Sequence, residues 1–146
     1  MNLDPIHAAI PHREPFLLVD TIVRQAADQI VCRKTFSGEE FWYRGHYPDF
    51  PLTPGVLLCE AAMQAGAILL AQYAAESGPR VPVATRMTDV KFKRMVRPGD
   101  TIEVDVRLDE RLADAFFLTA KVSVDGRVAV RFRFACTLAS RETLGD

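Results

Sequence analysis

Two ionisable side chains stand out because of their surroundings in the sequence. His46 lies in a segment rich in proline, glycine and aromatic residues, whereas Glu60 lies in an almost entirely apolar segment. A carboxylate among apolar side chains is costly unless it is paired. Burial of a carboxyl group also favours its protonated form, which makes a general acid available near neutral pH. A histidine nearby would supply the base.

The residues around Glu60 complete a set suited to elimination chemistry. Pro54-Gly55 opens the apolar segment, so the Gly55 N–H would lie at the positive end of a helix and suit an oxyanion developing on a thioester carbonyl. Gln64 follows Glu60 by four residues, which places both on one helix face. A base, an acid and an oxyanion donor suit proton abstraction beside a carbonyl with loss of a neighbouring hydroxyl. Neither a nucleophile–base pair nor a glycine-rich phosphate loop is visible.

The apolar segment itself predicts a long buried helix over residues 55–75. Its start at Pro54-Gly55 and its end at Ser77-Gly78-Pro79 are typical helix boundaries. Glu60, Gln64 and Gln72 would be unfavourable in lipid, which argues against membrane insertion. Because the segment is apolar nearly all round, other elements must enclose it.

The remaining segments supply this enclosure. Residues 101–109 and 130–138 alternate between apolar and polar side chains, which predicts strands with one buried face. Further strands are predicted over residues 16–24, 29–36, 83–96 and 116–124, a short helix over 3–10 and a loop over 37–54. One curved antiparallel sheet around one buried helix is the hot-dog fold, of the α+β class. We expect residues 1–146 to form a single domain.

Composition narrows the classes of function. The 146 residues carry 18 Lys+Arg and 19 Asp+Glu, so global charge does not indicate a nucleic-acid partner. Three cysteines without a CxxC spacing predict neither disulfides nor a zinc site, and Cys59 reads as a small buried thiol. We expect no metal and no cofactor. No basic-then-apolar leader is visible, and a cytoplasmic location is expected.

Three motifs in order resemble a known family. They are Pro11-His12-Arg13-Glu14-Pro15-Phe16-Leu17-Leu18-Val19-Asp20, the stretch from Gly45-His46-Tyr47-Pro48 to Gln64, and Lys91-Phe92-Lys93-Arg94 with Val96 and Pro98-Gly99-Asp100. Together they resemble the (3R)-hydroxyacyl-[acyl-carrier-protein] dehydratases of bacterial fatty acid synthesis, a hot-dog family. The resemblance covers residues 6–139.

The resemblance implies a role for each candidate residue. His46 would remove the Cα proton, Glu60 would protonate the departing hydroxyl or hold the water, and the Gly55 N–H would polarise the thioester carbonyl. Gln64 would support the carboxylate. The implied product is a trans-2-enoyl thioester, and glutamate at position 60 resembles the branch that does not isomerise double bonds. In the family the His and Glu of one site come from different subunits, so a homodimer, or a hexamer of three dimers, is implied.

A run of cations follows the helix. Residues 86–97 contain one acid, Asp89, and five cations: Arg86, Lys91, Lys93, Arg94 and Arg97. A solvated strand face is the default interpretation of such a run. With the resemblance, we favour a docking surface for an acidic acyl carrier protein and its phosphopantetheine phosphate, formed by Lys91, Lys93, Arg94 and Arg97. His12-Arg13 is interpreted as organising its loop.

Several positions depart from the family pattern. Asp49 replaces a common glycine, which aspartate can do in the left-handed region, and Thr53 replaces a bulky apolar residue. Arg44 replaces a common glutamine, and Val83-Ala84-Thr85 lacks the usual aromatic and glycine pattern. Asp49 and Thr53 leave open a non-catalytic acyl-binding paralogue. A hot-dog acyl thioesterase also stays open, because it would share the fold and a carboxylate on the helix.

Overall fold

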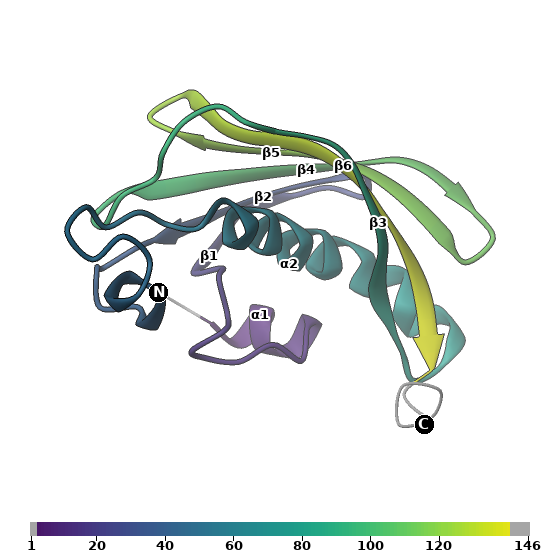
Figure 1. Cartoon of the computed structure of the whole chain (residues 1–146). Coiled ribbons are helices and arrows are strands. Elements are labelled where there is room, and N and C mark those ends of the chain that lie inside the picture. Colours follow the sequence, from purple (N-terminus) through teal and green to yellow (C-terminus); the bar gives the residue numbers. More distant parts are fainter. Residues whose placement is uncertain (1–2, 141–146) are drawn as a thin grey trace.

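A computed structural model of the chain describes residues 3–140 (Figure 1). It contains two α-helices, α1 (Asp4–Ala9) and α2 (Gly55–Ala74), and two 3-10 turns, η1 (Phe41–Arg44) and η2 (Ala75–Ser77). The strands are β1 (Thr21–Gln25), β2 (Gln29–Thr35), β3 (Arg80–Phe92), β4 (Thr101–Leu112), β5 (Ala115–Val124) and β6 (Arg127–Ser140). The predicted single domain of 1–146 extends into residues 1–2 and 141–146, which lie outside the described residues.

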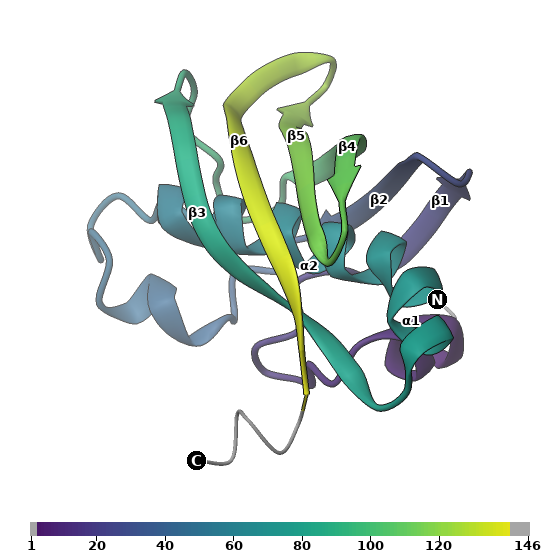
Figure 2. The same ribbon diagram turned by 90° about the vertical axis from the view of Figure 1, so that its right-hand side faces the viewer.

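The six strands form one antiparallel sheet in the order β1-β2-β4-β5-β6-β3. The sheet arches over α2, with α1 on the opposite side of that helix, and Figure 2 shows the same arrangement after a quarter turn. In β4 the side chains of Ile102, Val104 and Val106 are fully buried, whereas their polar neighbours point outward. The predicted hot-dog architecture is confirmed.

Helix α2 packs closely against the sheet because small residues occupy its contact face. A Cβ atom added at Gly66 would approach the ring of Phe134 on β6 to 2.7 Å, so the Phe134 side chain packs directly against the backbone of the helix there. Within residues 3–140, α2 is the one helix long and apolar enough to span a membrane, and most of it is buried in the fold. This agrees with its interpretation as a core helix.

The predicted strand over residues 16–24 is mostly wrong. Strand β1 begins at Thr21, while Leu17, Leu18 and Val19 are buried outside any strand. The reason is a side chain from α2: Gln64 accepts a hydrogen bond from the Leu18 N–H and donates one to the Phe16 carbonyl oxygen, at 2.7 and 2.8 Å. An amide side chain therefore takes the place of a neighbouring strand.

Strand β3 forms a free edge of the sheet. It spans Arg80–Phe92, whereas the sequence predicted residues 83–96, and irregular register interrupts its pairing with β6 between Ala84 and Arg86. The departure from the family pattern at Val83-Ala84-Thr85 therefore coincides with a bulge, a device common at sheet edges. The other predicted elements are confirmed, with ends shifted by a few residues.

The contact at Gly66 yields a stability prediction. Substituting Gly66→Val forces two methyl groups against Phe134 in a packed interior, so we expect the free energy of unfolding to fall by about 1–3 kcal/mol. Urea denaturation followed by circular dichroism measures this change. Gly45→Ala is the control, because nothing lies within 4 Å of a Cβ atom at that position. Equal stability of the Gly66→Val and natural proteins would contradict the packing described.

Candidate active site

The loop that precedes α2 fixes the orientation of His46. Its backbone N–H donates to the carbonyl oxygen of Trp42 in η1 at 2.8 Å. Its ring nitrogen Nδ1 lies 3.0 Å from the carbonyl oxygen of Leu52. Because a carbonyl oxygen can only accept, Nδ1 carries the proton and Nε2 of the neutral ring keeps a free lone pair. The loop thus leaves Nε2 of the imidazole able to accept a proton.

A hollow of about 370 Å³ opens beside His46. It is lined mainly by apolar groups, including Leu58, Phe92 and Met95, and by Gly55 at the first turn of α2. Within the described chain the Gly55 N–H has no hydrogen-bond acceptor, as expected for the start of a helix. A Cβ atom at this position would come within 2.5 Å of Phe92, so glycine lets the Phe92 ring pack against the first turn of α2.

Glu60 lies on α2 at the level of its second turn. Its side chain is 23% exposed, and its Oε2 atom accepts a hydrogen bond from Gln64 Nε2 at 3.0 Å. Gln64 is 1% exposed and is held in turn by the backbone of Phe16 and Leu18. Over residues 3–140, Oε1 of Glu60 has no hydrogen-bond partner. The carboxyl group is therefore anchored through one oxygen and open at the other.

The structure does not bring all four predicted site residues into one cavity of a single chain. His46 and Gly55 line the hollow, whereas Glu60 and Gln64 are not among its lining residues. Their neighbour is instead His12, whose Nε2 lies 3.8 Å from Glu60 Oε2. This contact could not be predicted from the sequence, because no local pattern relates residue 12 to residue 60. The one feature of the sequence that marked His12 was its place in the first of the three family motifs, residues 11–20.

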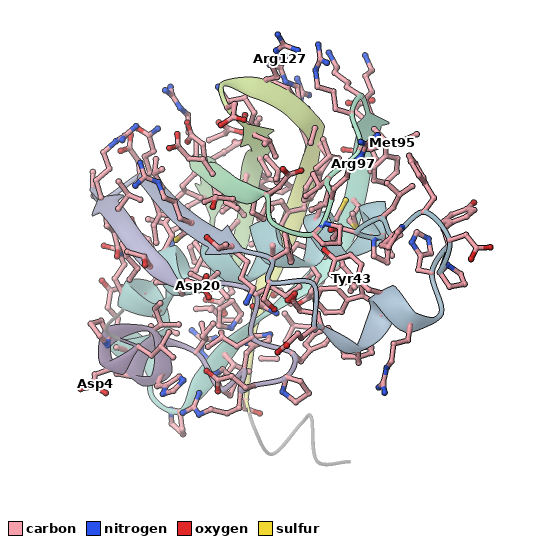
Figure 3. The ribbon with its side chains drawn as sticks, turned by 90° about the vertical axis from the view of Figure 1, so that its left-hand side faces the viewer. Asp4, Asp20, Tyr43, Met95, Arg97 and Arg127 are labelled. Atoms are coloured by element: carbon pink, nitrogen blue, oxygen red, sulfur yellow. The ribbon has the colours of Figure 1, made fainter. Side chains whose placement is uncertain are left out.

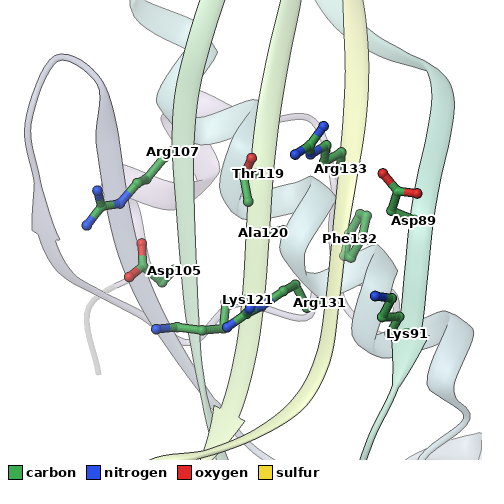
Figure 4. A pocket seen from close by; sticks show the side chains of 10 residues that line it. All are labelled: Asp89, Lys91, Asp105, Arg107, Thr119, Ala120, Lys121, Arg131, Phe132 and Arg133. Carbon is green, nitrogen blue, oxygen red and sulfur yellow. The ribbon is translucent and has the colours of Figure 1, made fainter.

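The predicted docking residues point in different directions. Lys91 lines a hollow of about 470 Å³ on the outer face of the sheet, among Arg107, Lys121, Arg131 and Arg133 (Figure 4). Arg94 lines the hollow beside His46 instead. The Arg97 guanidinium stacks over the ring of Phe50 at 4.9 Å. Figure 3 shows Arg97 and Met95 in the segment between β3 and β4. Lys93 is exposed. Their docking role stays a prediction.

The departure from the family pattern at Thr53 has a structural explanation. Thr53 is buried, and its hydroxyl is hydrogen-bonded to the hydroxyl of Tyr43. Burial raises the pKa of Tyr43. In the loop Tyr47, rather than Asp49, adopts the left-handed conformation, with φ of 55°. The explanation expected for Asp49 is therefore wrong, and its exposed side chain has no evident structural reason.

Comparisons with known proteins show the family to which the chain is related. The family model described as "FabA-like domain" matches residues 10–133. The chain is 32% identical, over 97% of its length and 88% of the relative, to a 3-hydroxyacyl-[acyl-carrier-protein] dehydratase FabZ of Solibacter usitatus. It is 38% identical, over 88% of its length and 92% of the relative, to the FabZ of Clostridium perfringens SM101.

A solved structure supports the fold. The dehydratase heterocomplex ApeI:P of Xenorhabdus doucetiae contains a chain that superposes with a TM-score of 0.81 at 17% sequence identity. The match covers 96% of the present chain and 94% of that chain. The uncharacterised protein PH1136 of Pyrococcus horikoshii gives a TM-score of 0.66, also at 17% identity. At 17% identity, these two similarities show the fold alone.

The three thiols of the chain give a direct test of the packing around the site. Burial raises the pKa of Cys59, next to Glu60, to about 11, and it likewise raises the pKa of Cys136 to about 11 and that of Cys32 to about 12. All three side chains are buried. Because the thiolate is the reactive form, we expect no rapid reaction of the native protein with a chromogenic disulfide reagent. All three thiols should react in concentrated guanidinium chloride. Rapid labelling of Cys59 in the folded protein would contradict this.

Proposed function

Because the chain belongs to the FabA-like family, it is a 3-hydroxyacyl-[acyl-carrier-protein] dehydratase of fatty acid synthesis, and we propose that His46 and Glu60 carry out its reaction. The observation that carries this proposal is the hydrogen bond from His46 Nδ1 to the Leu52 carbonyl oxygen. It leaves Nε2 free beside a hollow whose wall includes the Gly55 N–H. A base and an oxyanion donor thus face the same space.

The proposed reaction uses the atoms of these groups that have no hydrogen-bond partner within the described residues. His46 Nε2 takes a proton from C2 of the acyl chain, and the thioester carbonyl oxygen accepts a hydrogen bond from the Gly55 N–H as negative charge develops on it. The electron pair of the broken C2–H bond forms the C2–C3 double bond while the C3–O bond breaks. Glu60 gives its proton to the departing hydroxyl, which leaves as water. The proton on His46 then passes through solvent to Glu60, which restores both groups to their starting forms.

The anchoring of Glu60 determines which oxygen acts. Oε2 accepts the hydrogen bond from Gln64, so the acidic proton belongs on Oε1. Gln64 is itself held by two backbone groups, at 2.7 and 2.8 Å, and cannot turn away without leaving them unpaired in the interior. A positioned carboxyl group of this kind suits a general acid.

We further propose that a second copy of the chain completes the site. Met87 and Phe92 of β3 lie directly opposite Phe134 and Val130 of β6, so they face the helix side of the sheet. Nevertheless they are 39% and 56% exposed. The concave face thus continues beyond α2 onto an uncovered, apolar edge strand, and Phe92 also lines the His46 hollow. Pairing of two copies there would bring the His46 of one to the Glu60 of the other.

The proposed carrier protein approaches the same opening. Arg94 lines the hollow beside His46, and Arg97 and Lys93 are exposed on the neighbouring segment. These cations suit the phosphate of a phosphopantetheine arm that enters the hollow. Lys91 lies on the outer sheet face and would contact the carrier protein only at the periphery. A cytoplasmic location stays a prediction.

Two substitutions test the chemistry. We expect His46→Asn and Glu60→Gln each to lower kcat for hydration of an enoyl-carrier-protein thioester by about 10²–10⁴-fold, because each removes one partner of the proton transfer. Loss of ultraviolet absorption by the conjugated thioester measures the rate. Natural protein that is inactive on carrier-protein and coenzyme A thioesters of several chain lengths would contradict the proposal. Release of free thiol without hydration would indicate a thioesterase instead.

The proposed pairing through β3 has its own test. Met87→Asp places a charge on the uncovered helix side of the sheet, and we expect it to convert dimers into monomers in sedimentation velocity experiments. Thr88→Asp is the matched control, because Thr88 lies opposite the exposed Arg133 and faces outward. Dimers that withstand Met87→Asp as well as Thr88→Asp would place the interface elsewhere.

A further inference from the structure

The surroundings of Glu60 include a histidine that the proposed reaction does not use. His12 Nε2 lies 3.8 Å from Glu60 Oε2, the oxygen that also accepts from Gln64. The His12 side chain is 29% exposed, but its Nδ1 atom is buried and has no hydrogen-bond partner within residues 3–140. One edge of the ring is therefore enclosed, and the other faces the carboxyl group.

The main chain around His12 is held in place by the next residue. Arg13 donates through Nη1 to the carbonyl oxygens of Ile10 and His12, at 2.8 and 2.7 Å, and through Nη2 to that of His7, at 3.1 Å. One guanidinium thus ties the end of α1 to the turn that carries His12. This agrees with an organising role for Arg13. The backbone at His12 is therefore held by contacts that do not involve Glu60.

The enclosed edge also determines the tautomer of the neutral ring. A proton on Nδ1 would be a buried N–H donor without an acceptor, which is more costly than an unshared lone pair. In the neutral ring the proton therefore belongs on Nε2, directed at Glu60. The separation of 3.8 Å is longer than a hydrogen bond, but catalytic contacts in a free enzyme are often long and shorten when substrate binds.

We propose that His12 is a positioning residue that acts through Glu60: its Nε2–H and Gln64 Nε2–H together hold Oε2 and leave Oε1 to face the substrate. This inference rests on the proposed function of Glu60. When Oε1 gives up its proton to the departing hydroxyl, the carboxyl group becomes negative, and a second donor on Oε2 stabilises that charge. This stabilisation arises in the transition state, so its loss lowers kcat and leaves KM nearly unchanged.

Two substitutions at His12 distinguish the contribution of the Nε2–H donor to kcat from that of the shape of the ring. His12→Phe keeps a flat ring but removes the donor, and His12→Gln keeps a donor near the place of Nε2 but removes the ring. We expect His12→Phe to lower kcat about tenfold with KM changed less than twofold, and His12→Gln to retain about half of the natural kcat. His7→Phe is the control: His7 lies on the same segment but pairs with Glu14 at 3.4 Å, and its kcat should be unchanged.

The alternatives give different patterns. If His12 only fills space, His12→Phe will be active and His12→Gln will be impaired, in parallel with their melting temperatures, and the inference fails. Equal kcat for His12→Phe and the natural protein would also overturn it. These outcomes are distinct from failure of the proposed function, in which the natural protein is inactive or Glu60→Gln has no effect. Melting temperatures within a few degrees of the natural protein make the kinetic comparison valid.

Discussion

The hydrogen bond between Gln64 and Glu60 is the interaction on which the rest of the site depends. A carboxyl group on the core helix needs a partner, and Gln64 supplies it from the next turn. Gln64 must in turn satisfy its remaining groups, which it does on the backbone of Phe16 and Leu18. The N-terminal segment therefore crosses α2 instead of joining the sheet. This path also places His12 beside Glu60. The buried amide of Gln64 therefore connects the proposed acid, helix α2 and the N-terminal segment.

The sheet, through its edge strand β3, forms the surroundings of the hollow beside His46. Because β3 is a long free edge with apolar side chains exposed on its inner face, a single chain leaves the hollow beside His46 open to one side. An unpaired edge of this kind is usually covered or paired. The loop that holds His46 and the turn that opens α2 meet at this opening. The fold thus separates the proposed base and oxyanion donor from the proposed acid within one chain, and the proposed association of two chains would bring them together.

The sequence predicted the parts of this arrangement that depend on local pattern. The alternation in β4 and the start of α2 at Gly55 were visible because each reflects burial along one element. The strand expected over residues 16–24 failed because its hydrogen bonds are taken by Gln64, a partner distant in sequence. The contact of His12 with Glu60 was hidden for the same reason. The cations that were predicted to form one docking surface lie in two places. Lys91 lies in β3 and lines the outer hollow, whereas Arg94 follows β3 and lines the hollow beside His46.

Mixing two inactive variants tests the central claim, that the base and the acid of one site come from different chains. His46→Ala and Glu60→Gln proteins would be denatured together, refolded and assayed for hydration of an enoyl thioester. In a mixed dimer one site carries both substitutions and the other carries neither. Because random pairing makes half of the dimers mixed, we predict recovery of about a quarter of the natural activity. A mixture as inactive as either variant alone would contradict the claim.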